Sequence, residues 1–197
     1  VVFRLLFGGL MLFSTARFMA LGWVEDHFIA PQLHFTYYGF GWVQPLPDWG
    51  LYAVHVAMLL GAAGVLLGAW YRLAAAVLFL TFTYAHLLDV SYYLNHYYFV
   101  SLVALWMIGL PAHRSFSIDA WRRPDLACTH VPAWTIGLLK FQIILVYFYA
   151  GVAKINADWL LEAMPLALWL PAKDTIPVIG PLFRWEVTPW LFSWAGM

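Results

Sequence analysis

Long apolar runs dominate the chain, and short polar or proline-rich stretches separate them. A helix that crosses the hydrocarbon core of a bilayer needs roughly 20 predominantly apolar residues. Five apolar runs stand out, and we predict that each forms a membrane-crossing helix. They cover residues 1–23, 51–70, 73–88, 97–110 and 133–155. The pattern therefore predicts an all-α fold, a polytopic transmembrane helix bundle of about five spans.

The segments between the predicted helices differ in character. Loop 24–49 is rich in aromatic residues, Pro and Gly and has no Lys or Arg, whereas segment 89–96 is short and too polar to face lipid. Loop 111–132 is hydrophilic and contains three arginines. Residues 156–197 include five prolines and no apolar run that is long enough to cross a bilayer. We therefore expect this last segment to be interfacial or re-entrant.

Glycines and arginines add detail to the first two predicted helices. Gly61, Gly64 and Gly68 give the second helix a small face, which favours close packing against a neighbouring helix. Arg4 and Arg17 lie near the ends of the first helix, where we expect their side chains to extend to the membrane interface.

Composition supports membrane residence. Apolar residues make up 64% of the 197 residues and charged residues 10%, and the mean hydropathy is +0.77. Soluble domains are nearer half apolar and a quarter charged, so a soluble fold of this size lacks the polar residues to cover its surface. The formal net charge of zero gives no indication of nucleic acid as a partner. The single cysteine, Cys128, excludes an internal disulfide bond.

The positions of the arginines predict how the helices are oriented, because cytoplasmic loops carry an excess of Lys and Arg. Five arginines fall on one side of the alternating path of the helices: Arg4, Arg72, Arg114, Arg122 and Arg123. This distribution places the N-terminus in the cytoplasm. It also places Asn95, His96 and Lys154 together at the non-cytoplasmic face. Arg17, near the outer end of the first helix, is the exception.

The first apolar segment does not look like a signal peptide. The chain starts at Val1 with neither an initiator Met nor a charged n-region, and Arg4 and Arg17 interrupt a long apolar run. We expect residues 1–197 to form one transmembrane domain and to be a fragment of a longer protein.

Lys154 is the first candidate for chemistry, because an ionisable residue at an apolar span is costly and marks a functional site by default. The small residues Ala150, Gly151 and Ala153 would let a helix or a flat ligand approach closely. Loss of hydration favours the neutral form of an amine, and a neutral amine can act as a base. The alternative is a structural lysine that extends to the interface or pairs with Asp158, one helical turn away.

Asn95 and His96 are the second candidate, since they lie in the polar connection between the third and fourth predicted helices. The alternative is that Asn95 caps a helix and that His96 is merely interfacial. His86 and Asp89 are three residues apart, so a shared helix face would let them pair or satisfy each other in the core.

The sequence contains no motif that indicates a metal site or a nucleotide-binding site. The histidines show no HxxxH or HExxH spacing, and there is no CxxC pair. A haem between helices stays open, although no two histidines are matched across the predicted bundle. The GxGxxG, Walker and nucleophile-elbow motifs are also absent from the sequence.

The sequence around Lys154 is similar to a known signature. Residues 144–159 read ILVYFYAGVAKINADW, which closely resembles the core signature of the vitamin K-dependent γ-glutamyl carboxylases. Four other stretches resemble the same family in the same order, namely FRLLFG at 3–8, PLPDW at 45–49, LLD with NH at 87–96 and HVPAW at 130–134. These carboxylases belong to a wider group of membrane proteins with the HTTM domain. The resemblance covers nearly the whole chain.

The resemblance implies a reaction and its catalytic residues. In the family, the residue that matches Lys154 is the base that starts the oxygenation of vitamin K hydroquinone, and the positions of His96 and Asn95 serve the proton chemistry. The family reaction is a lyase-type carboxylation, which uses the hydroquinone, O2 and CO2. It converts protein glutamate to γ-carboxyglutamate and leaves the quinone as its 2,3-epoxide. Ala153 departs from the family pattern, which has a basic residue before the lysine.

The same resemblance implies the cofactor and partners. We expect vitamin K hydroquinone or bacterial menaquinol as the reduced naphthoquinone, membrane lipid as the surroundings and a glutamate-containing protein as the substrate. We expect Tyr147, Gly151 and His86 to contact the quinone.

A membrane enzyme is a sensible host for such a reaction. The γ-hydrogen of glutamate is too weakly acidic for a side chain to remove at neutral pH, so a stronger base has to form away from water. Oxidation of a lipophilic quinol can supply that base, and the quinol, O2 and CO2 all dissolve well in an apolar phase. The alternative is a non-catalytic membrane module that binds a quinone or lipid and anchors a partner domain. Retained quinone without epoxide or modified glutamate would favour this alternative.

Overall fold

The computed structural model describes residues 1–196, and all regular secondary structure within that range is helical. The chain forms two compact units, Val1–Thr135 and Ile136–Met197. The predicted all-α fold is confirmed.

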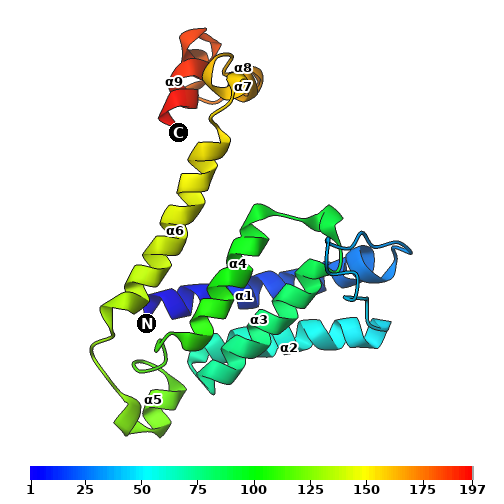
Figure 1. Ribbon diagram of the computed structural model, residues 1–197, viewed down its shortest axis with the longest axis vertical. Coiled ribbons are helices and arrows are strands. Elements are labelled where there is room, and N and C mark those ends of the chain that lie inside the picture. The colour runs from blue at the N-terminus through cyan, green and yellow to red at the C-terminus, as the bar shows by residue number, and fades with distance from the viewer. Residues whose placement is uncertain (197) are drawn as a thin grey trace. The chain divides into compact units, whose positions relative to one another are not determined.

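The first unit is built on four long helices within residues 1–135: α1 (Val2–Ala20), α2 (Asp48–Leu67), α3 (Tyr71–Leu87) and α4 (Asn95–Gly109). α1 packs against α2, α2 against α3, and α3 against α4 (Figure 1). Four of the five predicted runs therefore coincide with these helices. The connections contain four short elements: η1 (Glu25–Ile29), η2 (Val90–Tyr92), α5 (Ile118–Arg122) and η3 (Pro124–Leu126).

The second unit consists of the long helix α6 (Ala133–Ala153), which begins in the last residues of the first unit, and a group of short elements. The short elements are α7 (Ala157–Leu160), α8 (Met164–Trp169), η4 (Pro171–Lys173), η5 (Gly180–Arg184) and α9 (Val187–Ala195). Two reciprocal hydrogen bonds tie α7 to α9, from Trp159 Nε1 to Ser193 O (2.9 Å) and from Ser193 Oγ to Trp159 O (2.6 Å). None of the described helices after α6 is long enough to cross a bilayer. The interfacial or re-entrant position of this segment stays a prediction.

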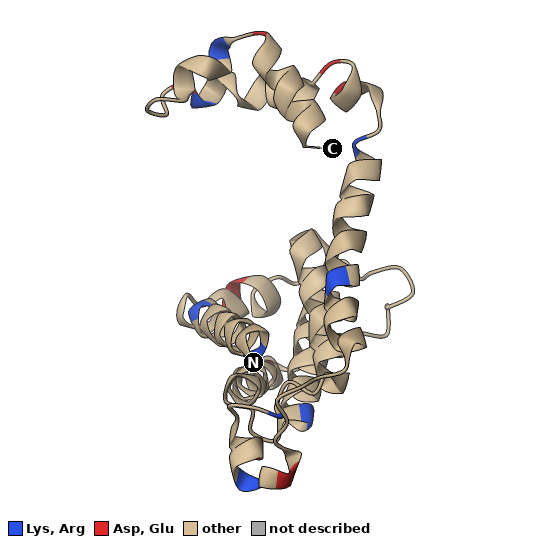
Figure 2. Ribbon diagram, turned by 90° about the vertical axis from the view of Figure 1, so that its left-hand side faces the viewer, with Lys and Arg blue, Asp and Glu red and all other residues tan. Residues whose placement is uncertain are grey.

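Among the helices of residues 1–196, three are long and apolar enough to cross a membrane: α1, α2 and α6. α3 is apolar but has 17 residues, and α4 has 15. Because a helix rises about 1.5 Å per residue, these two fall somewhat short of a full crossing. Charged residues are sparse along the long helices (Figure 2). The structure thus confirms a membrane-type helical fold, in which three of the five predicted helices are long and apolar enough to cross a bilayer and two are shorter.

The predicted small face of α2 is confirmed at two of its glycines. A Cβ atom at Gly61 would lie 2.9 Å from Leu78 N of α3, and one at Gly64 would lie 2.6 Å from Ala74 Cβ. Both distances are shorter than van der Waals contact, and the atoms that would be hit belong to the backbone or to a Cβ that cannot rotate away. The absence of side chains at these positions therefore allows α2 and α3 to approach closely.

Replacement of Gly64 by alanine is expected to destabilise the first unit by about 1–3 kcal/mol, because the new methyl group has to push α3 away from α2. Gly9→Ala is the matched control. It also adds a methyl group inside an apolar helix, but the nearest atom to the new Cβ would be 3.8 Å away. Thermal unfolding in detergent, followed by circular dichroism, compares the two variants. An unchanged Tm for Gly64→Ala would show that the contact between α2 and α3 does not depend on the glycine.

Arg4 does not extend to the interface as expected, because its side chain is fully buried. Its Nη1 donates to Leu66 O (2.8 Å) and Val65 O (3.2 Å), and its Nη2 donates to Phe116 O. The last carbonyl groups of a helix lack partners within the helix and carry partial negative charge. The arginine therefore caps the C-terminal end of α2.

Asp119 of α5 completes this junction from the other direction. Its carboxylate accepts hydrogen bonds from Trp70 N (2.8 Å) and Tyr71 N (2.9 Å), the first amides of α3. Its own amide donates to Gly68 O (2.9 Å). Gly68 ends α2 in the left-handed conformation (φ 65°), where a Cβ would collide with the Arg4 guanidinium. A glycine is required at this position on both grounds.

Candidate functional site

A cavity of about 600 Å³ lies within the first unit, between α1, η1, α2, the C-terminal part of α3 and the start of α4. Its volume is in the range of small-molecule sites, and aromatic and aliphatic side chains form most of its wall. Four histidines contribute to the wall: His27, His55, His86 and His96. Residues 1–196 contain no group of three or more His, Cys, Asp or Glu side chains that could hold a metal ion.

The aromatic loop between η1 and α2 is fastened to the segment that follows α3. Val90 N donates to Phe35 O (2.8 Å). The Tyr84 hydroxyl, on α3, donates to Gln44 O (2.9 Å) and accepts from Leu46 N (3.0 Å). These bonds hold loop and helix together at the end of the unit where the cavity lies.

His96 lines the cavity from the first turn of α4, and its ring lies 4.7 Å from that of Tyr97, edge to face. Both His96 and Asn95 are exposed, so this part of the wall is at the rim of the cavity. Asn95 is the first residue of α4, whose N-cap residue is Leu94, and no side chain caps this helix. Capping of α4 by Asn95 is therefore not observed.

His86 lies near the end of α3, among three tyrosines. The centroid of the His86 ring lies 5.5 Å from that of Tyr37, 5.7 Å from that of Tyr93 and 6.1 Å from that of Tyr97. Two of these rings, Tyr93 and Tyr97, also line the cavity. The contact of His86 with a quinone stays a prediction, and its position in the cavity wall is compatible with that role.

Asp89 does not pair with His86, contrary to the expectation from their spacing. Its buried carboxylate pairs with His34 (3.4 Å) and accepts hydrogen bonds from Ser91 N (2.8 Å) and Ser91 Oγ (2.6 Å). Burial by itself would raise the pKa of the Asp89 carboxyl, but the hydrogen bonds from Ser91 and His34 outweigh it and lower the pKa. Asp89 therefore remains ionised at neutral pH, and its stabilising contribution is lost only as the pH falls through this lowered pKa.

Two histidines of the cavity wall had no predicted role in ligand binding. His55 is 3% exposed and stacks in parallel with Phe18, at 5.5 Å between ring centroids. The His27 ring lies 4.4 Å from the Tyr92 ring. Neither histidine has a neighbour at helical spacing that marks it as functional, so no signal in the sequence could have identified them.

Lys154 follows directly after α6 in the second unit. Its Nζ donates a hydrogen bond to Gly196 O and lies 5.0 Å from the centre of the Trp159 ring. Among the described residues it forms no ion pair with Asp158, so the structural alternative of a pair between these two is not observed. A backbone carbonyl and an aromatic face hold the amine instead.

Tyr147 and Gly151 also belong to the second unit, on α6. The Tyr147 side chain is exposed, and Gly151 is half-buried. His86, Asn95 and His96 belong to the first unit. The structure therefore brings His86 and His96 together at one cavity, and the grouping of Lys154, Tyr147 and Gly151 with them stays a prediction.

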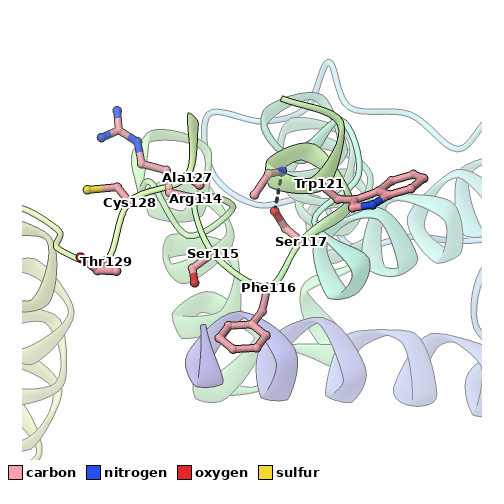
Figure 3. A pocket seen from close by; sticks show the side chains of 9 residues that line it. Arg114, Ser115, Phe116, Ser117, Trp121, Ala127, Cys128 and Thr129 are labelled. Carbon is pink, nitrogen blue, oxygen red and sulfur yellow. Dashed lines mark hydrogen bonds between the residues drawn. The ribbon is translucent and has the colours of Figure 1, made fainter. Parts of the chain in front are cut away.

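A second hollow of about 350 Å³ lies in the loop between α4 and α6. Figure 3 shows Arg114 and Cys128 on one side of it and Trp121 pointing away on the other. The Ser117 hydroxyl accepts a hydrogen bond from Ala120 N (3.0 Å), which fixes the start of α5. This hollow is smaller and contains none of the predicted site residues. The larger cavity of the first unit is therefore the better candidate for a site.

The comparisons with known proteins point to one family. Residues 1–197 match the HTTM domain, and no solved structure matches the chain. The match agrees with the resemblance carried by the motifs around Lys154 and with the apolar helices of the structure. The chain therefore belongs to the HTTM domain family, a domain that is also found in the vitamin K-dependent carboxylases.

Proposed function

We propose that this chain is a membrane enzyme of the vitamin K-dependent carboxylase type. In this proposal it couples oxygenation of a reduced naphthoquinone to the carboxylation of protein glutamate with CO2. The observation that carries the proposal is the cavity of about 600 Å³ in the first unit of an HTTM chain, with two of the predicted site residues, His86 and His96, in its wall.

The cavity suits a naphthoquinone, which is a flat apolar pair of fused rings with two oxygen atoms on opposite sides of one ring. Phe18, Phe28 and Tyr97 offer aromatic surfaces for the ring. Imidazole groups in the wall offer hydrogen-bond partners for the oxygen atoms. A bound reduced naphthoquinone supplies the electrons for O2 and, through its oxidation, a base that is stronger than any side chain.

The chain's own residues have three tasks in this proposal. Lys154 takes up the first proton as a neutral amine, which retains two N–H groups and so can keep its hydrogen bond to Gly196 O. His96, at the rim of the cavity, gives or takes a proton, since imidazole does both near neutral pH. Asn95, beside it and exposed, offers an amide as hydrogen-bond donor and acceptor. The orientation predicted from the arginines would place this chemistry at the non-cytoplasmic face.

The test uses the chain in lipid nanodiscs, supplied with a reduced naphthoquinone, O2, labelled CO2 and a glutamyl peptide. We expect quinone epoxide and label in the peptide from the wild-type chain, and a loss of both from His96→Ala. His113→Ala, which removes a histidine outside the cavity, is expected to retain both activities. If the wild-type chain retains the naphthoquinone but forms neither product, the enzymatic proposal is wrong and a non-catalytic quinone-binding module takes its place.

A further inference from the structure

We propose that His55 accepts a hydrogen bond from a hydroxyl group of the reduced quinone, and that it thereby makes the cavity selective for the hydroquinone over the oxidised quinone. This inference rests on the proposed function, because it takes a naphthoquinol as the occupant of the cavity. It assigns a specificity-determining role to a residue outside the motifs that resemble the carboxylases.

The hydrogen bonding of His55 determines which of its nitrogens carries the proton. Nδ1 lies 2.8 Å from Leu51 O, one turn earlier on α2. A carbonyl oxygen can only accept, so Nδ1 must be the donor. A neutral imidazole has one N–H group, and Nε2 is therefore left with a lone pair and no hydrogen.

The His55 ring is held in one orientation. Phe18 stacks on it with an angle of 4° between the ring planes, and Phe28 lies 5.7 Å away. The side chain is 3% exposed, and rotation about its side-chain bonds would break the bond to Leu51 O. The position of the Nε2 lone pair is thus fixed before any ligand binds, which reduces the entropy lost on binding.

The Nε2 atom is available to a ligand. Within residues 1–196 it has no hydrogen-bond partner. Among the described residues it is also absent from the enclosed side-chain N and O atoms that lack a partner, which include His27 Nδ1, so it is not sealed off from the cavity. Since His55 lines the cavity, Nε2 is reached from the space that a ligand would fill.

A fixed lone pair distinguishes the two redox forms of a quinone. The hydroquinone carries O–H groups, which donate to Nε2. The oxidised quinone carries carbonyl groups, which only accept, so its oxygen and Nε2 would face each other without a hydrogen between them. Sites that are built to hydrogen-bond one group reject an analogue that lacks it, because the buried partner is left unsatisfied. The cavity should therefore retain the substrate form and release the oxidised form.

The test measures equilibrium binding of 2-methyl-1,4-naphthoquinone and of its reduced form, without oxygen, to the chain in lipid nanodiscs. The wild-type chain is expected to bind the reduced form about tenfold more tightly or better. His55→Phe keeps an aromatic ring to stack on Phe18 but removes the lone pair. It should weaken binding of the reduced form by about tenfold and leave binding of the oxidised form unchanged.

His113→Phe is the matched control. His113 is also buried and stacked on an aromatic ring, at 5.0 Å from Tyr71, but it lies outside the cavity. The His113→Phe variant should bind the reduced and the oxidised form as tightly as the wild-type chain does. If His55→Phe lowers Tm, His55→Gln replaces it, since an amide can both accept and donate and should bind the two forms within about threefold of each other.

The outcomes separate this inference from the proposed function. Equal weakening of both redox forms by the His55 variants, or an unchanged preference, would overturn the role of His55 and leave the enzymatic proposal to its own test. If the wild-type chain does not bind the reduced form, both the role of His55 and the enzymatic proposal are wrong. Selective binding that depends on His55, in a chain that forms no epoxide, would support the role of His55 and reject the enzyme.

Discussion

Replacement of Lys154 by alanine is expected to lower quinol-dependent epoxide formation by about 10²–10⁴-fold, because this is the usual contribution of a positioned general base. Neither of the two groups that the structure places against the Lys154 amine can take over this task. Among the neighbours of Lys154, the Gly196 carbonyl is a backbone acceptor and the Trp159 indole is not a base. The measurement is the rate of epoxide formation by the chain in nanodiscs at saturating reduced naphthoquinone.

Two further variants separate the proposed chemistry from structural effects. Lys154→Arg retains a cation that can donate to Gly196 O and stack on Trp159, but a guanidinium does not give up a proton near neutral pH. It should keep the Tm of the wild-type chain and still lose epoxide formation. Lys140→Ala removes an exposed lysine from α6, the helix that ends just before Lys154, and should be fully active. Wild-type rates in Lys154→Ala would exclude Lys154 as the base.

The apolar pattern predicted the helices well because bilayer-crossing helices need long uninterrupted apolar runs. Residues 2–20, 48–67 and 133–153 fulfil this criterion in the structure. The pattern also located α3 and α4, predicted at 73–88 and 97–110 and observed at Tyr71–Leu87 and Asn95–Gly109, although both are shorter than a bilayer-crossing helix. Hydrophobicity alone does not determine whether such short helices cross the bilayer fully.

The cavity was not predictable in the same way, because contacts between distant residues build it. Asp89, which follows α3, pairs with His34, 55 positions earlier, and not with His86 near the end of that helix. Local spacing favoured the wrong partner, since a helical periodicity of three or four residues indicates only which residues could meet. His55 had no local signal either, and the role proposed for it is argued from its bond to Leu51 O and the stacked ring of Phe18.

Arg17 is the exception to the rule that Lys and Arg gather in cytoplasmic loops, and it lies at the cavity of the first unit. It is the cation that did not fit the predicted orientation. In the structure its guanidinium lies 5.0 Å from the centre of the Trp23 ring, and both residues line the cavity. A cation that stacks on an aromatic ring has a local reason to lie there, apart from the orientation of the helices. Lys154 was predicted by a similar argument, the cost of a charge at an apolar span, and its role stays a prediction.

Replacement of Arg4 by methionine is expected to destabilise the first unit by about 3 kcal/mol or more. Arg4 is 0% exposed and donates to three carbonyl groups, on Val65, Leu66 and Phe116. Methionine has a similar length and can fill the space, but it has no donor. The carbonyl of Leu66 lies in the last turn of α2 and would be left without the donor that Arg4 supplies, whereas Val65 O would keep only its bond from Gly68 N (3.2 Å). Chemical denaturation in detergent, followed by circular dichroism, measures the loss.

Arg4→Lys and Arg17→Met test the reason for this loss. The ammonium of lysine is a single point of charge and cannot spread its donors over three carbonyls as a planar guanidinium does, so Arg4→Lys should be intermediate in stability. Arg17→Met removes an exposed arginine from the same helix and should cost less than about 1 kcal/mol, since a surface cation contributes little. If Arg4→Met is as stable as Arg17→Met, the junction of α1, α2 and the loop at Phe116 is held by packing alone. Capping of α2 by the Arg4 guanidinium would then not be the reason why this charged residue is buried.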